Sequence, residues 1–311
     1  MASQRTALDA KPLGPRNINP DEQHTIETEY GQRVLREKRV TAFISKKEFD
    51  SKYYNIKSGK VLILNNSKDF RVPDTPLADR DGSDVDASTI CQRFAALPGF
   101  DDYDLETDLT KAETFQCFDR VKRSLNDKPV DCFILVLLSH GFDGGIYAID
   151  QPMMFDEIVS TFNATNCPQL RFKPKVIITQ ACRGLNLSSG VDIAIDPNQP
   201  DAVADYTEYV EYLGLQTVRL PNEADFLFAF ATVPGAGAFR HGEKGSPFIR
   251  HLCEALDKME INEDFYSVLT TVNKTVGLTY QPQNQQMELN RVVQMPCFVS
   301  HLTKILRLKQ N

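Results

Sequence analysis

Residues 177–184 read Ile-Ile-Thr-Gln-Ala-Cys-Arg-Gly, an apolar run that ends abruptly in polar residues around a cysteine. The pattern predicts a buried strand that carries the thiol of Cys182 at its carboxyl end, and Gly184 allows a tight exit from that strand. Open α/β sheets carry their chemistry at this end of their strands. The stretch therefore predicts an α/β fold with a functional cysteine at the edge of the sheet.

Short apolar runs alternate with amphipathic segments on both sides of this stretch. Strands are expected at 61–64, 103–105, 132–138, 175–179, 226–231 and 296–300, and helices at 84–97, 110–125, 155–162, 248–259 and 264–276. Thr110 and Glu113 form a capping-box pattern at the start of the second helix. This alternation predicts a mostly parallel sheet with helices on both faces.

Composition excludes several classes of function. The 311 residues are 41% apolar and 25% charged with a net charge of −7, so no nucleic-acid footprint is indicated. No run reaches the ~18 apolar residues needed to cross a bilayer, and the N-terminus lacks the apolar core of a secretion signal. An intracellular, cytoplasmic protein without a membrane partner is expected.

The seven cysteines form no C-x-x-C pair, and the five histidines fall in no ligand spacing, so no metal site is expected. Most of the cysteines are interpreted as small buried hydrophobic residues. Two polar segments interrupt the globular pattern. Residues 1–50 are interpreted as a mostly disordered leader with a short helix at 27–38, and 185–221 as a long exposed loop.

A second apolar strand, 132–138, also ends in reactive residues, because Ser139, His140 and Gly141 follow it. A thiol is only a few per cent thiolate at neutral pH, and a neighbouring imidazole can take its proton. The N–H groups of Gly141 and Cys182 are candidates for an oxyanion hole. Taken singly, a histidine or cysteine in such a place is more often structural, and the sequence alone does not bring the two together.

The chain resembles the caspases, which are clan CD cysteine endopeptidases. The matching blocks are Leu-Leu-Ser-His-Gly at 137–141, Gln-Ala-Cys-Arg-Gly at 180–184, Arg-Asp-Gly-Ser-Asp-Val-Asp at 80–86, Glu-Ala-Asp-Phe-Leu at 223–227, the segment 240–248 and Pro-Cys-Phe-Val-Ser at 296–300. They occur in the family's order and span about 53–309. The resemblance implies the caspase-like three-layer fold with a six-stranded sheet.

The resemblance also implies the roles of individual residues. His140 is the catalytic histidine and Cys182 the nucleophile, and no cofactor is needed. Arg80, Gln180 and Arg240 match the positions that bind a P1 aspartate, and two guanidinium forks with an amide donor suit a small carboxylate. Arg183 is interpreted as a supporting residue outside the substrate pocket.

Some positions depart from the family pattern. Gly237 and Ala238 stand where members that prefer small P2 residues carry tyrosine and serine, and Pro247 replaces the usual tryptophan of the P4 pocket. Phe239 keeps one aromatic wall of the substrate site. The S2 pocket is therefore expected to be roomier than usual, and no P4 preference is inherited from the family.

Family members are made as zymogens, which implies a division into a leader (1–50), a large subunit (51–201), a linker remnant (202–222) and a small subunit (223–311). Activation cleavage is expected after Asp201, which precedes alanine, with Asp205 as the weaker site. The resemblance further implies an executioner-type enzyme of apoptosis, a homodimer of large and small subunit pairs. An upstream caspase would activate it, and inhibitor proteins would bind it.

Two alternatives remain. A non-catalytic regulator of active relatives has no need to keep His140, Cys182 and the three pocket residues together. A clan CD hydrolase that cleaves after basic residues needs carboxylates where this chain has arginines.

Overall fold

The structure is a computed structural model that describes residues 44–183, 211–212, 215–216, 220–279 and 293–310. The chain divides into two units, 1–43 with 202–219 and 44–201 with 220–311. In the first unit the described part is a hairpin of β8 (Glu211–Tyr212) and β9 (Leu215–Gln216). The leader helix expected at 27–38 lies outside the described residues.

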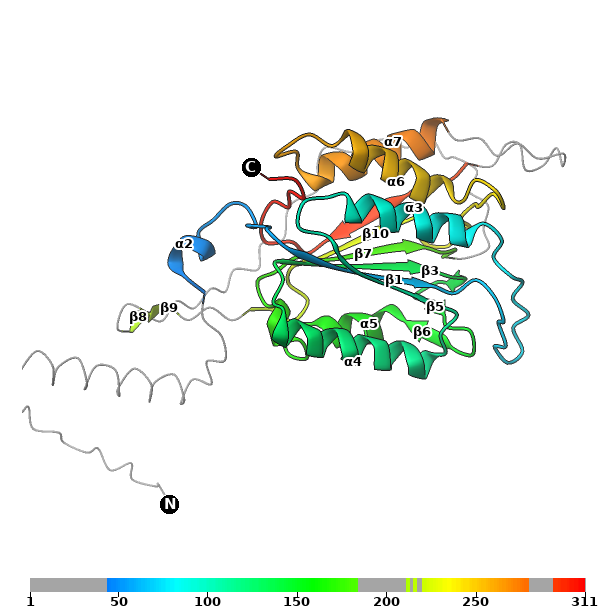
Figure 1. Cartoon of the computed structure of the whole chain (residues 1–311), viewed down its shortest axis with the longest axis horizontal. Helices are drawn as coiled ribbons and strands as arrows, with labels where there is room; N and C mark the ends of the chain where they lie inside the picture. Colours follow the sequence, from blue (N-terminus) through cyan, green and yellow to red (C-terminus); the bar gives the residue numbers. More distant parts are fainter. Residues whose placement is uncertain (1–43, 184–210, 213–214, 217–219, 280–292, 311) are drawn as a thin grey trace, which may run out of the picture. The chain divides into compact units, whose positions relative to one another are not determined.

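The second unit is built on a six-stranded sheet in the order β11-β10-β7-β3-β1-β2 (Figure 1). The strands are β1 (Gly59–Asn65), β2 (Asp102–Thr107), β3 (Cys132–Leu138), β7 (Lys175–Gln180), β10 (Phe226–Phe230) and β11 (Cys297–Ser300). Only β11 runs antiparallel to its neighbour among these described strands. The expected mostly parallel six-stranded sheet is confirmed.

The central strands are buried on both faces, which explains their continuous apolar runs. Every residue of β1, β3, β7 and β10 is buried. Along β1, Val61 and Ile63 join one apolar core, whereas Leu62 and Leu64 join the other. Each fully buried side chain of this size contributes about 1.5–3 kcal/mol to the free energy of folding. The sheet is therefore the middle layer of three.

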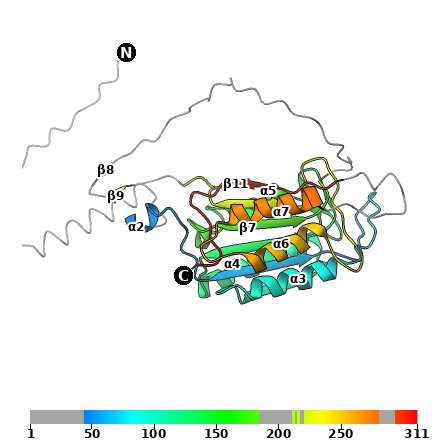
Figure 2. The same cartoon turned by 90° about the horizontal axis from the view of Figure 1, so that it is seen from above.

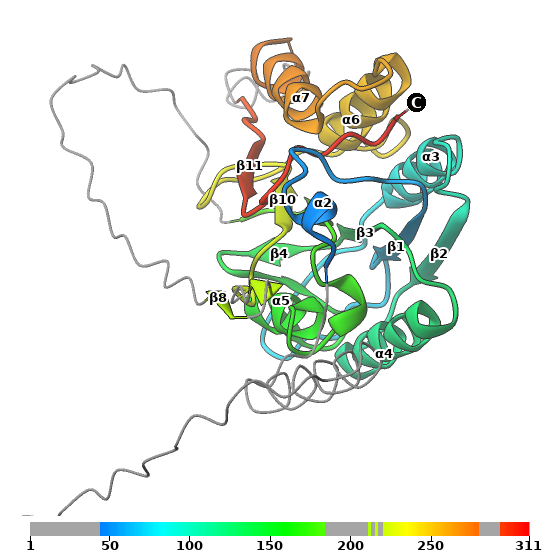
Figure 3. The ribbon, with the colours of Figure 1, turned by 90° about the vertical axis from the view of Figure 1, so that its left-hand side faces the viewer.

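Helices cover both faces of the sheet, as Figure 3 shows in a view along the strands. One face carries α3 (Ser83–Ala95), α6 (Pro247–Lys258) and α7 (Phe265–Thr279), which Figure 2 shows side by side. The other face carries α4 (Lys111–Asp127) and α5 (Phe155–Phe162). The capping box expected at α4 is present, because Thr110 and Glu113 bond each other's backbone N–H groups.

The register of β3 and β7 brings two predicted site segments to the same edge. Leu138 pairs with Gln180, and the Ser139 N–H donates to the Gln180 carbonyl across 3.3 Å. His140 and Cys182 each follow this pair by two residues. The loops after β1 and β10 leave the same edge of the sheet.

Several short elements differ from expectation. A small sheet of β4 (Gly141–Phe142), β5 (Gly145–Tyr147) and β6 (Pro152–Met154) follows His140, and α2 (Lys46–Phe49) and a 3₁₀ turn at Pro168–Leu170 were also not expected. The β8–β9 hairpin lies inside a segment interpreted as loop. Strands of two or three residues are too short to show an alternating pattern.

A buried polar cluster joins three distant segments at the amino-terminal ends of the parallel strands, opposite the end where His140 and Cys182 lie. The carboxylate of Asp225, just before β10, accepts from the Tyr54 hydroxyl and the Thr303 hydroxyl, each across 2.6 Å. Burial and the neighbouring Asp225 carboxylate raise the pKa of Tyr54. Residues before β1, before β10 and after β11 are therefore fastened to one carboxylate.

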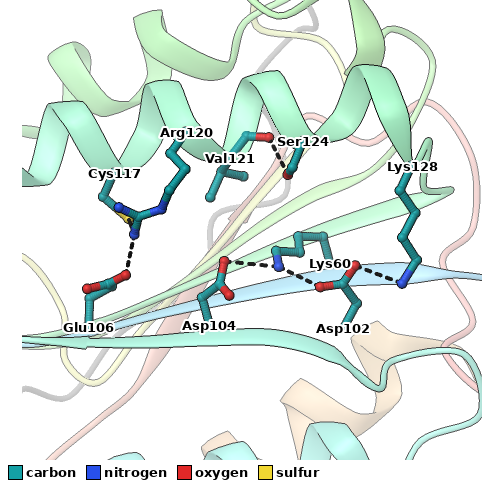
Figure 4. A network of polar contacts seen from close by, with 9 residues as sticks. All are labelled: Lys60, Asp102, Asp104, Glu106, Cys117, Arg120, Val121, Ser124 and Lys128. Atoms are coloured by element: carbon teal, nitrogen blue, oxygen red, sulfur yellow. Dashed lines mark hydrogen bonds and ion pairs between the residues drawn. The ribbon is translucent and has the colours of Figure 1, made fainter.

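The edge strand β2 presents carboxylates toward α4 (Figure 4). The buried ammonium of Lys60 contacts Asp102 at 2.5 Å and Asp104 at 3.0 Å, and Lys128 contacts Asp102 at 2.9 Å. Inward-facing charges of this kind discourage further strands from pairing with a sheet edge.

Candidate active site

The thiol of Cys182 differs from the other cysteines in its surroundings. It lies two residues beyond β7 and is half-buried, and its Sγ atom accepts from the Ala238 N–H across 3.3 Å. Burial raises the pKa of Cys91, Cys117, Cys132, Cys167, Cys253 and Cys297. A thiol with a raised pKa forms less thiolate and is a poor nucleophile at neutral pH.

The ring of His140 is oriented by a backbone group. Its Nε2 atom lies 2.7 Å from the carbonyl oxygen of Ala78, and the edge of the Phe70 ring packs against it with centroids 4.9 Å apart. Because a carbonyl only accepts, Nε2 carries the proton, and the neutral imidazole keeps the lone pair of Nδ1 for use as a base. Burial and the positive charges of Arg80 and Arg240 lower the pKa of His140, against the opposing effect of the Ala78 hydrogen bond.

Gly141 brings the histidine and cysteine segments into direct contact. A Cβ atom at this position would lie 2.3 Å from the Cys182 carbonyl oxygen and 2.8 Å from the Cβ of Ala181. Contacts below 3.0 Å essentially never occur for a real Cβ, so the close approach requires glycine here.

His140 and Cys182 lie on segments that contact each other at Gly141, but their side chains form no hydrogen bond with each other in the part of the chain that the structure describes. Catalytic hydrogen bonds are often long or misaligned without substrate and tighten when it binds. The arrangement places an acceptor nitrogen and a thiol on the two segments that Gly141 packs together.

Two arginines and a glutamine approach the cysteine from three segments. Arg80 is 2% exposed and donates to the Asn66 carbonyl, the Ser83 hydroxyl and the Gln180 carbonyl at 2.9, 2.6 and 3.4 Å. Arg240 donates through Nε to the Asp81 carbonyl across 2.8 Å.

The two guanidinium groups are close enough for their charges to act on each other, with Arg80 buried and Arg240 partly exposed. Burial and the charge of Arg240 lower the pKa of Arg80 to about 9, while Asp86 and Cys182 oppose this change. Burial likewise lowers the pKa of Arg240. Two positive charges beside a thiol, one of them buried, make a site that attracts an anion.

Gln180 has an amide that its surroundings barely satisfy. The side chain is 1% exposed, its Nε2 lies 3.5 Å from the Phe239 carbonyl, and its Oε1 has no partner among the described residues. The Nε2 contact is longer than an ordinary N–H···O hydrogen bond, so the N–H groups of this amide are available to a ligand that accepts.

The segment 237–240 forms the wall beside the thiol. The Phe239 N–H donates to Gln294 Oε1 across 2.7 Å, and Gln294 in turn donates to the Ala231 carbonyl across 2.8 Å. A Cβ atom added at Gly237 would meet nothing within 4 Å. Pro247 is buried at the first position of α6.

Arg183, interpreted from the sequence as a supporting residue, contacts the Phe230 ring and the Cys297 sulfur. Its guanidinium lies 4.1 Å from the centroid of the Phe230 ring, and Nη1 lies 3.8 Å from the Cys297 sulfur.

Sequence reasoning missed the groups that position the site. Ala78 acts through its carbonyl, so its residue type carries no sign of the role. Gln294 is buried and holds Phe239, but a single glutamine outside any motif gives no indication of this. The expected cleavage sites Asp201 and Asp205 lie outside the described residues.

The described residues hold no cluster of His, Cys, Asp and Glu suited to a metal ion, and their helices include none that would cross a bilayer.

Comparison with known proteins identifies the family of this chain. The family model described as the caspase domain matches residues 58–307. The chain belongs to the caspase family. Among its relatives, caspase-7 of Gallus gallus is 34% identical over 254 residues, which cover 80% of this chain and 77% of that protein. Caspase-3 of Oryctolagus cuniculus is 34% identical over 250 residues, which cover 80% and 83%.

The fold agrees with a solved caspase. Crystallised caspase-1 from Spodoptera frugiperda matches with a TM-score of 0.71 and 27% identity, over 87% of this chain and 97% of that one. Membership in the caspase family makes the protein a cysteine-type endopeptidase.

Proposed function

We propose that this caspase cleaves proteins after aspartate, with Cys182 as nucleophile and His140 as general base. The observation that carries the proposal is the contact of both arginine segments with the cysteine segment, because Arg80 donates to the carbonyl of Gln180 and the Ala238 N–H, two residues before Arg240, donates to the sulfur of Cys182. A P1 carboxylate would replace solvent between the two forks, and the Gln180 amide would bond its second oxygen. A glutamate is one methylene longer, so its scissile carbonyl would lie too far from the thiol.

In the proposed mechanism, Nδ1 of His140 takes the proton of Cys182 as the sulfur attacks the scissile carbonyl. The N–H groups of Gly141 and Cys182 stabilise the oxyanion, and loss of one such donor lowers turnover by ~10²–10³-fold. His140 then protonates the leaving amine, which leaves a thioester on Cys182. Water, deprotonated by His140, hydrolyses the thioester and restores the thiol. Phe239 forms the wall along which the substrate lies.

Proteolytic activation is part of the proposal. Cleavage after Asp201, or after Asp205, would separate a large subunit (51–201) from a small subunit (223–311), with 202–222 as linker remnant and 1–50 as leader. Support comes from the sheet, because β7 and β10 pair side by side although they would belong to different subunits. The pair would hold the fragments together after cleavage.

The assembly and biological role are also proposed. Strand β11 lies at one edge of the sheet, and its Val299 is 48% exposed, which suits pairing of two such units into a homodimer. By analogy with its relatives, the enzyme would act in apoptosis in the cytoplasm, with an upstream caspase as activator and inhibitor proteins as partners.

A panel of fluorogenic peptides with aspartate, glutamate, lysine or leucine at P1 tests the specificity. We expect hydrolysis of the aspartyl peptide alone, and loss of it in Cys182→Ala. Hydrolysis of the lysyl peptide would refute the arginine pocket. Absence of any hydrolysis by protein cleaved at the linker would favour a non-catalytic regulator.

A further inference from the structure

Asp86 is a buried carboxylate for which the mechanism has no use. It lies in the first turns of α3 and is 2% exposed. Its Oδ1 accepts from the Ser246 N–H across 2.7 Å, and its Oδ2 accepts from the Ser246 hydroxyl in a short hydrogen bond. Both carboxylate oxygens are thus bonded to the residue that precedes α6, 160 positions away in the sequence.

The backbone around Ser246 is fitted closely to this carboxylate. Gly245 has a φ of +70°, and a Cβ atom there would lie 2.3 Å from Oδ1 of Asp86. Only glycine both adopts this conformation readily and leaves room for the oxygen. The chain therefore passes directly over Asp86 on its way into α6.

The segment from Arg240 to Ser246, here the 240–246 loop, meets the start of α3 at two further points. Arg240 Nε donates to the Asp81 carbonyl across 2.8 Å. A Cβ atom at Gly82 would lie 2.4 Å from the His241 carbonyl oxygen. Contacts at both ends of the loop thus fix it against residues 81–86.

The loop is also closed on itself. His241 and Gly245 exchange two backbone hydrogen bonds, each 2.9 Å long. Because this bridge couples the two ends of the loop, the position of Ser246 constrains that of Arg240. A hydrogen bond at Ser246 can therefore act on the substrate pocket.

The charges around Asp86 also connect it to the two arginines of the candidate pocket. It is a buried acidic neighbour of both Arg80 and Arg240, which repel each other. Arg80 also faces Cys182 and Asp108, and Arg240 faces Cys182 and Asp81. No hydrogen bond joins Asp86 to either arginine among the described residues, so it acts on them through the loop and through its field.

We propose that Asp86 is a positioning residue for substrate recognition, which holds the 240–246 loop on α3 so that Arg240 is presented beside Arg80. The inference rests on the proposed function, in which these two arginines bind the P1 carboxylate.

The test compares KM and kcat for an aspartyl peptide in two variants. Asp86→Asn loses the charge that strengthens both hydrogen bonds, and Ser246→Ala loses one of those bonds while the charge stays. We expect KM to rise roughly ten-fold in Asp86→Asn and a few-fold in Ser246→Ala, with kcat within about two-fold of the parent enzyme. The rate of Cys182 alkylation by iodoacetamide should stay the same.

A purely electrostatic role of Asp86 predicts a change in KM of the opposite sign. If Asp86 acted only as a charge, its neutralisation would leave the pocket more positive and lower the KM for an anionic P1 residue. A lowered or unchanged KM in Asp86→Asn, or an unchanged KM in Ser246→Ala, would overturn the positioning role. Ser246→Ala keeps the test decisive should Asp86→Asn fail to fold, as thermal unfolding would reveal.

Asp257→Asn is the matched control. Asp257 of α6 pairs with Arg93 of α3 across 2.9 Å, but both side chains are partly exposed, so the same two helices are bridged away from the pocket. Its KM should match that of the parent enzyme. Arg240→Ala separates the two proposals. If KM rises in Arg240→Ala but is unchanged in Asp86→Asn or in Ser246→Ala, the positioning role alone is refuted. If KM is unchanged in Arg240→Ala, the arginine pocket is refuted and, with it, the positioning role.

Discussion

The Nε2 atom of His140 donates to the carbonyl oxygen of Ala78 across 2.7 Å, so a backbone group 62 positions earlier fixes the orientation of the imidazole. This bond leaves Nδ1 as the basic nitrogen. An alanine carbonyl does not titrate, unlike the carboxylate that orients histidine in many hydrolases. The histidine therefore depends on its wider surroundings for its basicity.

The pH dependence of kcat/KM should reflect these surroundings. Burial and the charges of Arg80 and Arg240 lower the pKa of His140 below 6.5, so the neutral, basic form persists to a lower pH. We expect the acid limb of the profile, which reports the free enzyme, to lie below 6.5. In Arg240→Gln the limb should move to higher pH, because a charge that disfavours the imidazolium is gone. A limb above 6.5 in the parent enzyme would contradict this account.

Substitution of Gly141 should affect turnover more than folding. In Gly141→Ala the new methyl group would collide with the Cys182 carbonyl, which forces the histidine and cysteine segments apart. We expect kcat to fall by ~10²-fold or more, comparable to the loss of one oxyanion donor. Gly277→Ala is the matched control, since its methyl group meets the flexible end of the exposed Met295 side chain, and its kcat should stay within about two-fold. Equal kcat values in the two variants would be incompatible with this geometry.

Replacement of Arg240 by lysine should weaken substrate binding although the charge is kept. Lysine lacks the Nε–H that bonds the Asp81 carbonyl and the planar fork that matches a carboxylate. The KM for an aspartyl peptide should rise roughly ten- to a hundred-fold, with a smaller change in kcat. Arg93→Lys, at a partly exposed ion pair, should leave KM as it is. Steady-state kinetics measure this KM. An unchanged KM in Arg240→Lys would argue against a bidentate contact between Arg240 and the substrate carboxylate.

The Asp225 cluster should contribute to stability. Tyr54→Phe removes a buried donor and leaves the Asp225 carboxylate with one hydroxyl partner fewer. We expect the free energy of unfolding to fall by about 1–3 kcal/mol, measured by urea titration of the Cys182→Ala protein to avoid self-cleavage. Tyr103→Phe, at a side chain that is exposed, should change it by less than about 0.5 kcal/mol. Similar values for both variants would show that the cluster is not needed for stability.

The sequence predicted the layers of the fold well, for a physical reason. Strands such as β3 are buried on both faces, so their apolar runs are continuous and end at polar residues that mark the sheet edge. Helices such as α4 carry a cap as well as a periodic face. The small sheet after His140 was not predicted, because its strands are two or three residues long and depend on the turn at Gly144.

For the candidate site, the sequence indicates residues only where side chains are expected to act. Cys182, His140 and the arginines belong to recognisable motifs, and the structure places them on neighbouring segments. The Ala78 carbonyl, the Gln294 support of Phe239 and the bonds from Ser246 to Asp86 arise from tertiary contacts between distant segments. No local pattern records such contacts, so the sequence did not disclose how the pocket is held in shape.

The two edges of the sheet differ in what they allow. Strands β2 and β11 each pair on one side only among the described strands, but β2 carries inward-facing carboxylates that pair with Lys60 (Figure 4). If two copies joined through β11, each would use the one outer strand that is free to pair, and the combined sheet would end in β2 on both sides. Such an assembly is closed at two members and offers no template for a fibre. The charged side chains at β2 would thus prevent further copies from adding to a dimer that formed through β11.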